Sequence, residues 1–204
     1  MGTAWADVPI TNASFEVLPP GGLNIGGCGP GCSYNVGSIP GWTIAPVLTQ
    51  GEFQPGSASG NFAYFNYVPD GVTVAYSNSL NTISQTLGKT VQTGQLYTLY
   101  VDLGNRNDGY NGGGSADLLI NGIHYAALGL QATPGTWTTW TASYVGLAAD
   151  AGKPITIELN TTSSQGDYDN VRLTAVPEPA ALLLMSVMGG VLLAFAGVMK
   201  RKLA

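Results

Sequence analysis

The sequence is poor in charge, and the little that it has is acidic. Asp, Glu, Lys and Arg make up 9% of the 204 residues, with 12 acidic against 7 basic side chains. The absence of basic patches argues against a nucleic-acid partner. A hydrophobic content of 45% is too high for a disordered chain, and the length suits one domain with a substantial core.

Catalytic groups are also scarce. His124 is the single histidine, and the sequence contains no G-x-S-x-G motif and no Ser-His-Asp order. Acidic residues are available for glycoside hydrolysis, but nothing in the sequence places two of them at one bond. These absences predict a protein that is not an enzyme, with a small hydrolase as the less favoured alternative.

The two cysteines, Cys28 and Cys32, lie in one Gly/Pro-rich segment. In an oxidising compartment this spacing predicts a local disulfide. A zinc site is disfavoured, because there is one histidine and no second cysteine pair.

What the chain does contain is a series of short segments with strand character. Alternation of apolar and polar residues is clearest at 95–103, and Asn121-Gly122 is the pair that a type I′ hairpin turn prefers. No convincing soluble helix is present, so the pattern predicts an all-β sandwich or barrel. The segments expected as strands are 10–16, 42–44, 61–68, 83–87, 95–103, 116–128, 136–145, 155–160 and 168–174.

One long apolar run lies at the end of the chain. Residues 180–199 carry no charge, and Ser186 is their only polar side chain. As a helix they would reach about 30 Å, the thickness of a bilayer core. The basic residues Lys200, Arg201 and Lys202 follow directly and should stay cytoplasmic. The run therefore predicts a single C-terminal transmembrane helix; a permanent anchor and a buried core helix are the alternatives.

The tail resembles the PEP-CTERM sorting signal of Gram-negative bacteria. The resemblance rests on an apolar span with a basic end, preceded by the motif Val176, Pro177, Glu178 and Pro179. It implies processing by an exosortase at the inner membrane, export to the envelope or beyond, and a setting of exopolysaccharide production. The expected division is a signal-peptide remnant (1–6, ending in the A-x-A form), a β-domain (7–175) and the sorting signal (176–204, with a basic tail at 200–204).

The β-domain resembles the galactose-binding-like jelly roll found in carbohydrate-binding modules. The similar segments are residues 12–16, 41–42, 84–87, 97–106, 137–140 and 169–173. The resemblance implies a structural calcium ion between the first and last strands, held by Glu16 and Asp169 with Asn12 and Asp167 as further oxygen donors. The alternative is that Glu16 and Asp169 only cap turns or pair with Arg172.

Sugar binding would use aromatic faces with amides or guanidinium groups nearby. The candidates are Trp42, Tyr64, Tyr100, Asn105, Arg106, Tyr110 and Trp140. The leading expectation is thus an exported, non-catalytic envelope or matrix protein with carbohydrate-binding potential. A purely structural surface protein without a glycan ligand is the alternative.

Overall fold

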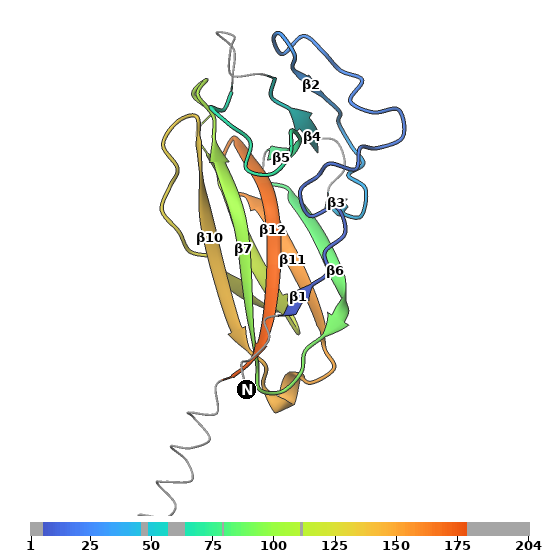
Figure 1. Ribbon diagram of the computed structural model, residues 1–204, viewed down its shortest axis with the longest axis vertical. Helices are drawn as coiled ribbons and strands as arrows, with labels where there is room; N and C mark the ends of the chain where they lie inside the picture. Colours follow the sequence, from blue (N-terminus) through green and yellow to red (C-terminus); the bar gives the residue numbers. More distant parts are fainter. Residues whose placement is uncertain (1–5, 46–48, 57–63, 79, 111, 179–204) are drawn as a thin grey trace, which may run out of the picture.

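Two antiparallel sheets pack face to face (Figure 1). The computed structural model describes residues 6–45, 49–56, 64–78, 80–110 and 112–178. The larger sheet has the order β10 (Thr136–Val145), β7 (Gln95–Asn105), β12 (Gln165–Pro177), β5 (Val74–Asn78), β4 (Gln50–Gln54) and β2 (Ser33–Tyr34), with β1 (Ala6–Val8) also paired to β12. The second sheet runs β3 (Thr43–Ala45), β6 (Thr82–Thr90), β11 (Pro154–Thr161), β8 (Gly114–Ile120) and β9 (Ile123–Ala126). The predicted all-β sandwich is confirmed; the described part adds one short 3-10 helix, η1 (Ala148–Asp150).

The core lies between the sheets because strand residues alternate in direction. Along β7, Leu99 and Val101 are fully buried, and Ile157 and Leu159 of β11 meet them from the other sheet. Tyr168 of β12 is also fully buried, and its hydroxyl donates to the carbonyl of Asn160 at 2.6 Å. The polar end of this large side chain is thus satisfied inside the core.

The hairpin predicted around Asn121-Gly122 is confirmed. Both residues have positive φ, 50° and 80°, as a type I′ turn requires, and Ile120 pairs with Ile123 across it. Strands β7, β10, β11 and β12 likewise overlap the segments expected from alternation.

Two expected strands are wrong. Residues 10–16 form a turn in place of a strand, since Asn12 and Phe15 adopt positive φ and the Asn12 side chain accepts a hydrogen bond from the backbone of Val17. In the segment 61–68, the described residues 64–68 also lack strand pairing. Strands β4 and β5 were not predicted, because their sequences show no alternation. They lie between β12 and β2 in the larger sheet.

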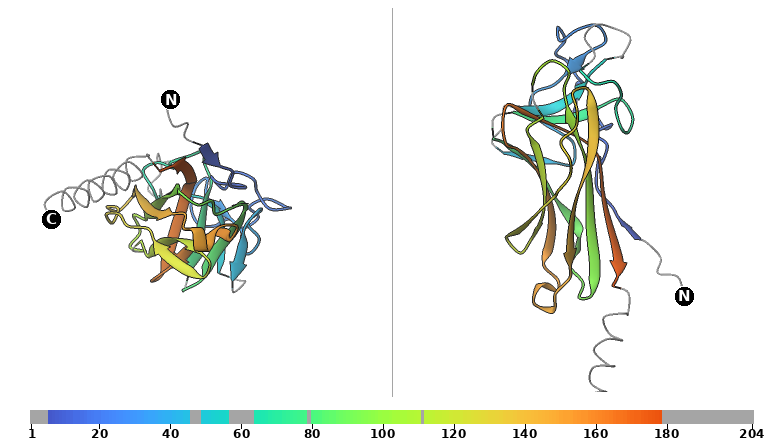
Figure 2. Two further views of the ribbon diagram at one scale, coloured as in Figure 1. Left: turned by 90° about the horizontal axis from the view of Figure 1, so that it is seen from below. Right: turned by 90° about the vertical axis from the view of Figure 1, so that its left-hand side faces the viewer.

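The two ends of the described chain lie at one end of the sandwich, away from β2 and the long 19–41 loop (Figures 1 and 2). Val176 and Pro177 belong to β12, and the Glu178 backbone donates to Gly94. No helix in the described part is long and apolar enough to cross a membrane. Residues 1–5 and 179–204 lie outside that part, so the apolar span at 180–199, its basic end, its handling by an exosortase and the export of the chain stay predictions.

Candidate active site

A cavity of about 390 Å³ lies beside β2, β4 and β5. These strands lie at the end of the sandwich opposite to the two ends of the described chain (Figure 1). The walls of the cavity come from β2, β4, β5, the start of β12 and the loops on either side of them. The lining residues are Cys28, Tyr34, Val36, Thr49, Phe53, Tyr64, Tyr76, Asn78, Arg106, Tyr110 and Gln165.

Aromatic rings form one side of the cavity. Phe53 of β4 meets Tyr64 edge-on at 5.2 Å between ring centroids and Tyr76 of β5 at 6.4 Å. Tyr34 of β2 continues the series against Tyr76 at 6.4 Å. These edge-to-face contacts are the arrangement that aromatic pairs prefer, and together they form a continuous aromatic wall.

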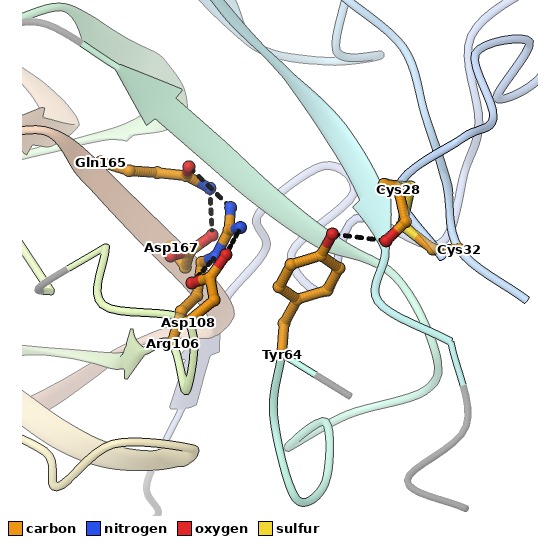
Figure 3. A network of polar contacts seen from close by, with 7 residues as sticks. All are labelled: Cys28, Cys32, Tyr64, Arg106, Asp108, Gln165 and Asp167. Atoms are coloured by element: carbon orange, nitrogen blue, oxygen red, sulfur yellow. Dashed lines mark hydrogen bonds and ion pairs between the residues drawn. A yellow bond between two sulfur atoms is a disulfide. The ribbon is translucent and has the colours of Figure 1, made fainter. Parts of the chain in front are cut away.

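The guanidinium of Arg106 lies among these rings. Its central carbon is 4.2 Å from the ring centre of Tyr64 and 4.8 Å from that of Tyr110. Asp108 accepts two hydrogen bonds from it, and Gln165 accepts another at 2.8 Å (Figure 3). Cation–π contacts and a two-pronged carboxylate pair therefore fix the position of the Arg106 charge.

Asp167 lies beneath Arg106 and Gln165 in β12, almost entirely out of solvent (Figure 3). Its Oδ1 accepts a hydrogen bond of 2.9 Å from the Gln165 amide, while its Oδ2 is buried without a partner in the described structure. Burial raises the pKa of Asp167 from 3.8 to about 7, although Arg106 and Gln165 act in the opposite direction. Burial thus favours the protonated form of this carboxyl.

This arrangement suits general acid catalysis. A catalytic acid works best when its pKa lies near the operating pH, as that of Asp167 does. Once the proton has left, the carboxylate is stabilised by the Arg106 charge and by the Gln165 hydrogen bond. Asp167 does not itself line the cavity; it lies directly behind Gln165, which does. A strongly perturbed acid next to a cavity wall is a candidate functional group on physical grounds.

Comparison with known proteins decides the family. The family model described as HpiC1-like, HpiC1 cyclase, matches residues 6–174. The chain belongs to the HpiC1 cyclase-like family. No curated protein matches the chain significantly.

Solved structures agree with this membership. A Stig cyclase, Fisc from Fischerella sp. TAU in complex with (3Z)-3-(1-methyl-2-pyrrolidinylidene)-3H-indole, is 25% identical, with a TM-score of 0.70, over 86% of this chain and 100% of that one. A cyclase from Fischerella sp. TAU in complex with 4-(1H-indol-3-yl)butan-2-one is also 25% identical, with a TM-score of 0.67, over 85% of this chain and 99% of that one.

Membership in a cyclase family overturns three expectations. The chain is not assigned to the PEP-CTERM, carbohydrate-binding-module-like proteins, because the matching model covers the whole β-domain and describes a cyclase. The expected non-catalytic surface or matrix role is wrong, and so is the expectation that the protein is not an enzyme. The expectation that the protein is not an enzyme rested partly on the scarcity of histidine. That argument is weak, because a buried carboxyl can act as an acid without any histidine.

The structure brings together three of the seven residues suggested for sugar binding. Tyr64, Arg106 and Tyr110 line the cavity. The other four lie elsewhere among the described residues: Trp42 packs on Phe15 in the core, Tyr100 packs on Arg172, Asn105 is buried against Ala132, and Trp140 donates to the carbonyl of Leu130.

Only two of the four predicted calcium donors, Asn12 and Glu16, share an environment; Asp167 and Asp169 each lie in another one. Asp167 faces Arg106, as described above. Asp169 accepts hydrogen bonds from the backbones of Asp70 and Asn170, and burial together with nearby Asp70 and Asp102 raises its pKa to about 8. The carboxylate of Glu16 accepts from the backbones of Val72 and Thr73, next to Asp70 in the chain.

Asn12 and Glu16 share an acidic neighbour, Glu52, that the sequence did not suggest as a calcium donor. Glu52 of β4 is fully buried; its Oε1 accepts a hydrogen bond of 3.1 Å from Asn12, and its Oε2 has no partner in the described structure. Burial and the Glu16 charge raise its pKa to about 7. The carbonyls of Val17 and Pro40 point at the same Asn12 amide. Oxygen donors of this kind are those that calcium prefers.

A different group could also hold a cation. Asp117, His124 and Glu158 place their ligand atoms within 4.8 Å of one another on the outer face of β8, β9 and β11. Asp117 and Glu158 lie directly opposite each other across the strands, and His124 contacts both at 3.4 Å. The half-exposed His124 ring bridges two carboxylates, which accounts for the cluster without an ion.

Proposed function

We propose that this protein is a cyclase that closes a ring on a flat, indole-type substrate by proton transfer from Asp167. The observation that carries the proposal is the partnerless Oδ2 of a buried Asp167, which lies directly behind Gln165 in the wall of an aromatic cavity. Indole-type compounds are bound by two solved cyclases that are 25% identical to this chain.

Substrate binding follows from the shape and lining of the cavity. Its volume of about 390 Å³ lies within the range of small-molecule sites. A planar aromatic group would lie against Phe53, Tyr34 and Tyr76, whose rings offer both faces and edges. The amides of Asn78 and Gln165 supply hydrogen bonds for orientation.

The reaction is an isomerisation, so atoms and electrons balance within the substrate. Protonated Asp167 gives its proton to a basic atom of the substrate and becomes a carboxylate. An electron pair of the substrate's unsaturated side chain then forms the new ring bond at the carbon made electron-poor by that proton. The closed cation loses a proton back to the Asp167 carboxylate, which restores the acid.

The surrounding side chains favour each stage. Before transfer, burial keeps Asp167 protonated; after transfer, Arg106 stabilises the carboxylate. Because Asp108 already neutralises Arg106, the guanidinium repels a cationic intermediate less than a free one would. Ring faces such as that of Phe53 attract the positive charge of the intermediate.

We further propose a structural calcium ion beside Glu52, with Asn12 and Glu16 as neighbours. The buried, partnerless Oε2 of Glu52 fits a cation, whereas the backbone donors around Asp169 and the guanidinium beside Asp167 fit one poorly. An ion there would remove the repulsion between Glu52 and Glu16 and connect the 10–17 turn to β4. It would have no part in the proton transfer.

Binding of 4-(1H-indol-3-yl)butan-2-one, measured by calorimetry, tests the proposed site. We expect saturable one-site binding, weakened roughly 3- to 10-fold in Phe53→Leu because one aromatic contact is lost. Tyr100→Leu is the matched control, since Tyr100 also packs on an arginine but lies outside the cavity lining. Equal affinities for the three proteins would place the probe outside the cavity and contradict the proposal.

A further inference from the structure

The disulfide loop forms part of the cavity wall. Cys28 and Cys32 are bonded, Cys28 lines the cavity, and its carbonyl accepts a hydrogen bond from the Tyr64 hydroxyl (Figure 3). Cys32 is buried and is followed directly by β2, which carries Tyr34 into the same cavity. Each cysteine of the disulfide is therefore linked to a tyrosine of the cavity wall: Cys28 to Tyr64 by a hydrogen bond, and Cys32 to Tyr34 through the chain.

Tyr64 needs such support because its own segment is not a strand. Residues 64–70 are turns and irregular backbone, so no sheet ladder fixes the Tyr64 side chain. Its ring nevertheless lies 4.2 Å from the Arg106 guanidinium carbon and 5.2 Å from the centre of Phe53. The hydroxyl bond to Cys28 fixes the far edge of the ring in this position.

We propose that the Cys28–Cys32 disulfide is a positioning element of the active site, which fixes the Cys28 carbonyl so that Tyr64 holds Arg106 in place over Asp167. This inference rests on the proposed function. Arg106 in turn binds Gln165, and Gln165 binds Asp167, so the chain of contacts reaches the proposed acid.

The bridge is placed to act locally. It closes a loop of only five residues, and in the chain-entropy account the global stabilisation by a disulfide grows with loop length. Between the cysteines, Gly29 and Gly31 have positive φ, so the open loop would gain much conformational freedom. Opening the bridge should therefore release the Cys28 carbonyl while leaving the core between the sheets intact.

The NMR signal of the Arg106 Nε–Hε group reports the local position of Arg106 and does not depend on the overall stability of the fold. In the wild type, the ring of Tyr64 should shift this proton upfield and its hydrogen bond to Asp108 should slow its exchange with water. In Cys28→Ser/Cys32→Ser we expect the upfield shift to be largely lost and the affinity for 4-(1H-indol-3-yl)butan-2-one to fall about 10-fold, as for about 1.4 kcal/mol of lost binding energy.

Tyr64→Phe keeps the ring and removes only the hydroxyl, and it should show a smaller loss in the same direction. Tyr67→Phe is the matched control, because Tyr67 is a half-exposed tyrosine of the same segment and lies outside the cavity lining. If the double variant does not fold, Tyr64→Phe and mild reduction of the wild type decide the question in its place.

An unchanged Arg106 resonance in a folded variant without the bridge, or in Tyr64→Phe, would overturn the positioning role. Failure of the proposed function has a different signature: the wild type would not bind the probe, while the Arg106 resonance would still respond to the bridge. A response in Tyr67→Phe equal to that in Tyr64→Phe would also overturn the inference, since the effect would then not depend on the Cys28 carbonyl.

Discussion

Asp167→Asn should lower ring-closing turnover by at least about 100-fold, the usual contribution of a general acid. Asparagine has nearly the same shape and still offers an oxygen to the Gln165 amide, but it has no transferable proton. Turnover can be followed with indoles that carry an unsaturated side chain, since the product has the mass of the substrate and separates from it by chromatography. Affinity for the indole probe should change little.

The pH dependence of wild-type turnover should follow the titration of Asp167. Because the acid form is required and the pKa of Asp167 is about 7, turnover should fall as pH rises above 7, about tenfold per unit.

Asp150→Asn is the control for Asp167→Asn. Asp150 is also buried, but it is hydrogen-bonded to Tyr144 and Asn121, away from the cavity, so this variant should keep the wild-type turnover. Wild-type turnover in Asp167→Asn would refute the assignment of Asp167 as the acid.

Without calcium, the protein should become less stable as pH rises from about 4 to about 8. Burial raises the folded-state pKa of Glu52 and Asp167 to about 7 and that of Asp169 to about 8. In this window the native state keeps protons that the unfolded chain has lost, so stability decreases with pH. Each pKa unit corresponds to about 1.4 kcal/mol and the three groups act together, so the melting temperature in EDTA should fall by about ten degrees or more between pH 5 and pH 8.

Calcium should reverse much of this loss at pH 8. An ion beside Glu52 favours the charged carboxylate and stabilises the fold by about 2.7 kcal/mol at a hundredfold excess over Kd. Glu52→Gln, which imitates the protonated side chain, should reduce both the pH slope and the calcium response. A melting temperature that rises with pH in EDTA, or a calcium response that is equal in Glu52→Gln, would contradict these assignments.

Much of the fold was predictable from local pattern. Burial alternates over all eight residues of β11 and over the first half of β7. Asn121 and Gly122 are residue types that adopt the positive φ of a type I′ turn. Strands β4 and β5 escaped prediction because each has only five residues, nearly all of them buried, and burial on both faces removes the alternation.

The candidate site was harder to predict for the same reason. Phe53 and Tyr76 lie on those two unpredicted strands, and Glu52, the carboxyl best placed for calcium, precedes Phe53. Tyr64, Arg106 and Tyr110 could be selected as possible ligand contacts from their side-chain chemistry. Their common cavity could not be predicted, because Tyr64 was expected in a strand and the cavity forms only in the fold. The role of Asp167 depends on its burial under Gln165, which only the folded β12 creates.

The most direct test of the central claim is a crystal structure of the full chain with 4-(1H-indol-3-yl)butan-2-one. The account predicts the indole ring in the cavity, against the rings of Phe53 and Tyr76, with a polar atom of the ligand within hydrogen-bond distance of Asp167 Oδ2. A ligand bound elsewhere on the sandwich, with the cavity empty and Asp167 Oδ2 still without a partner, would contradict it.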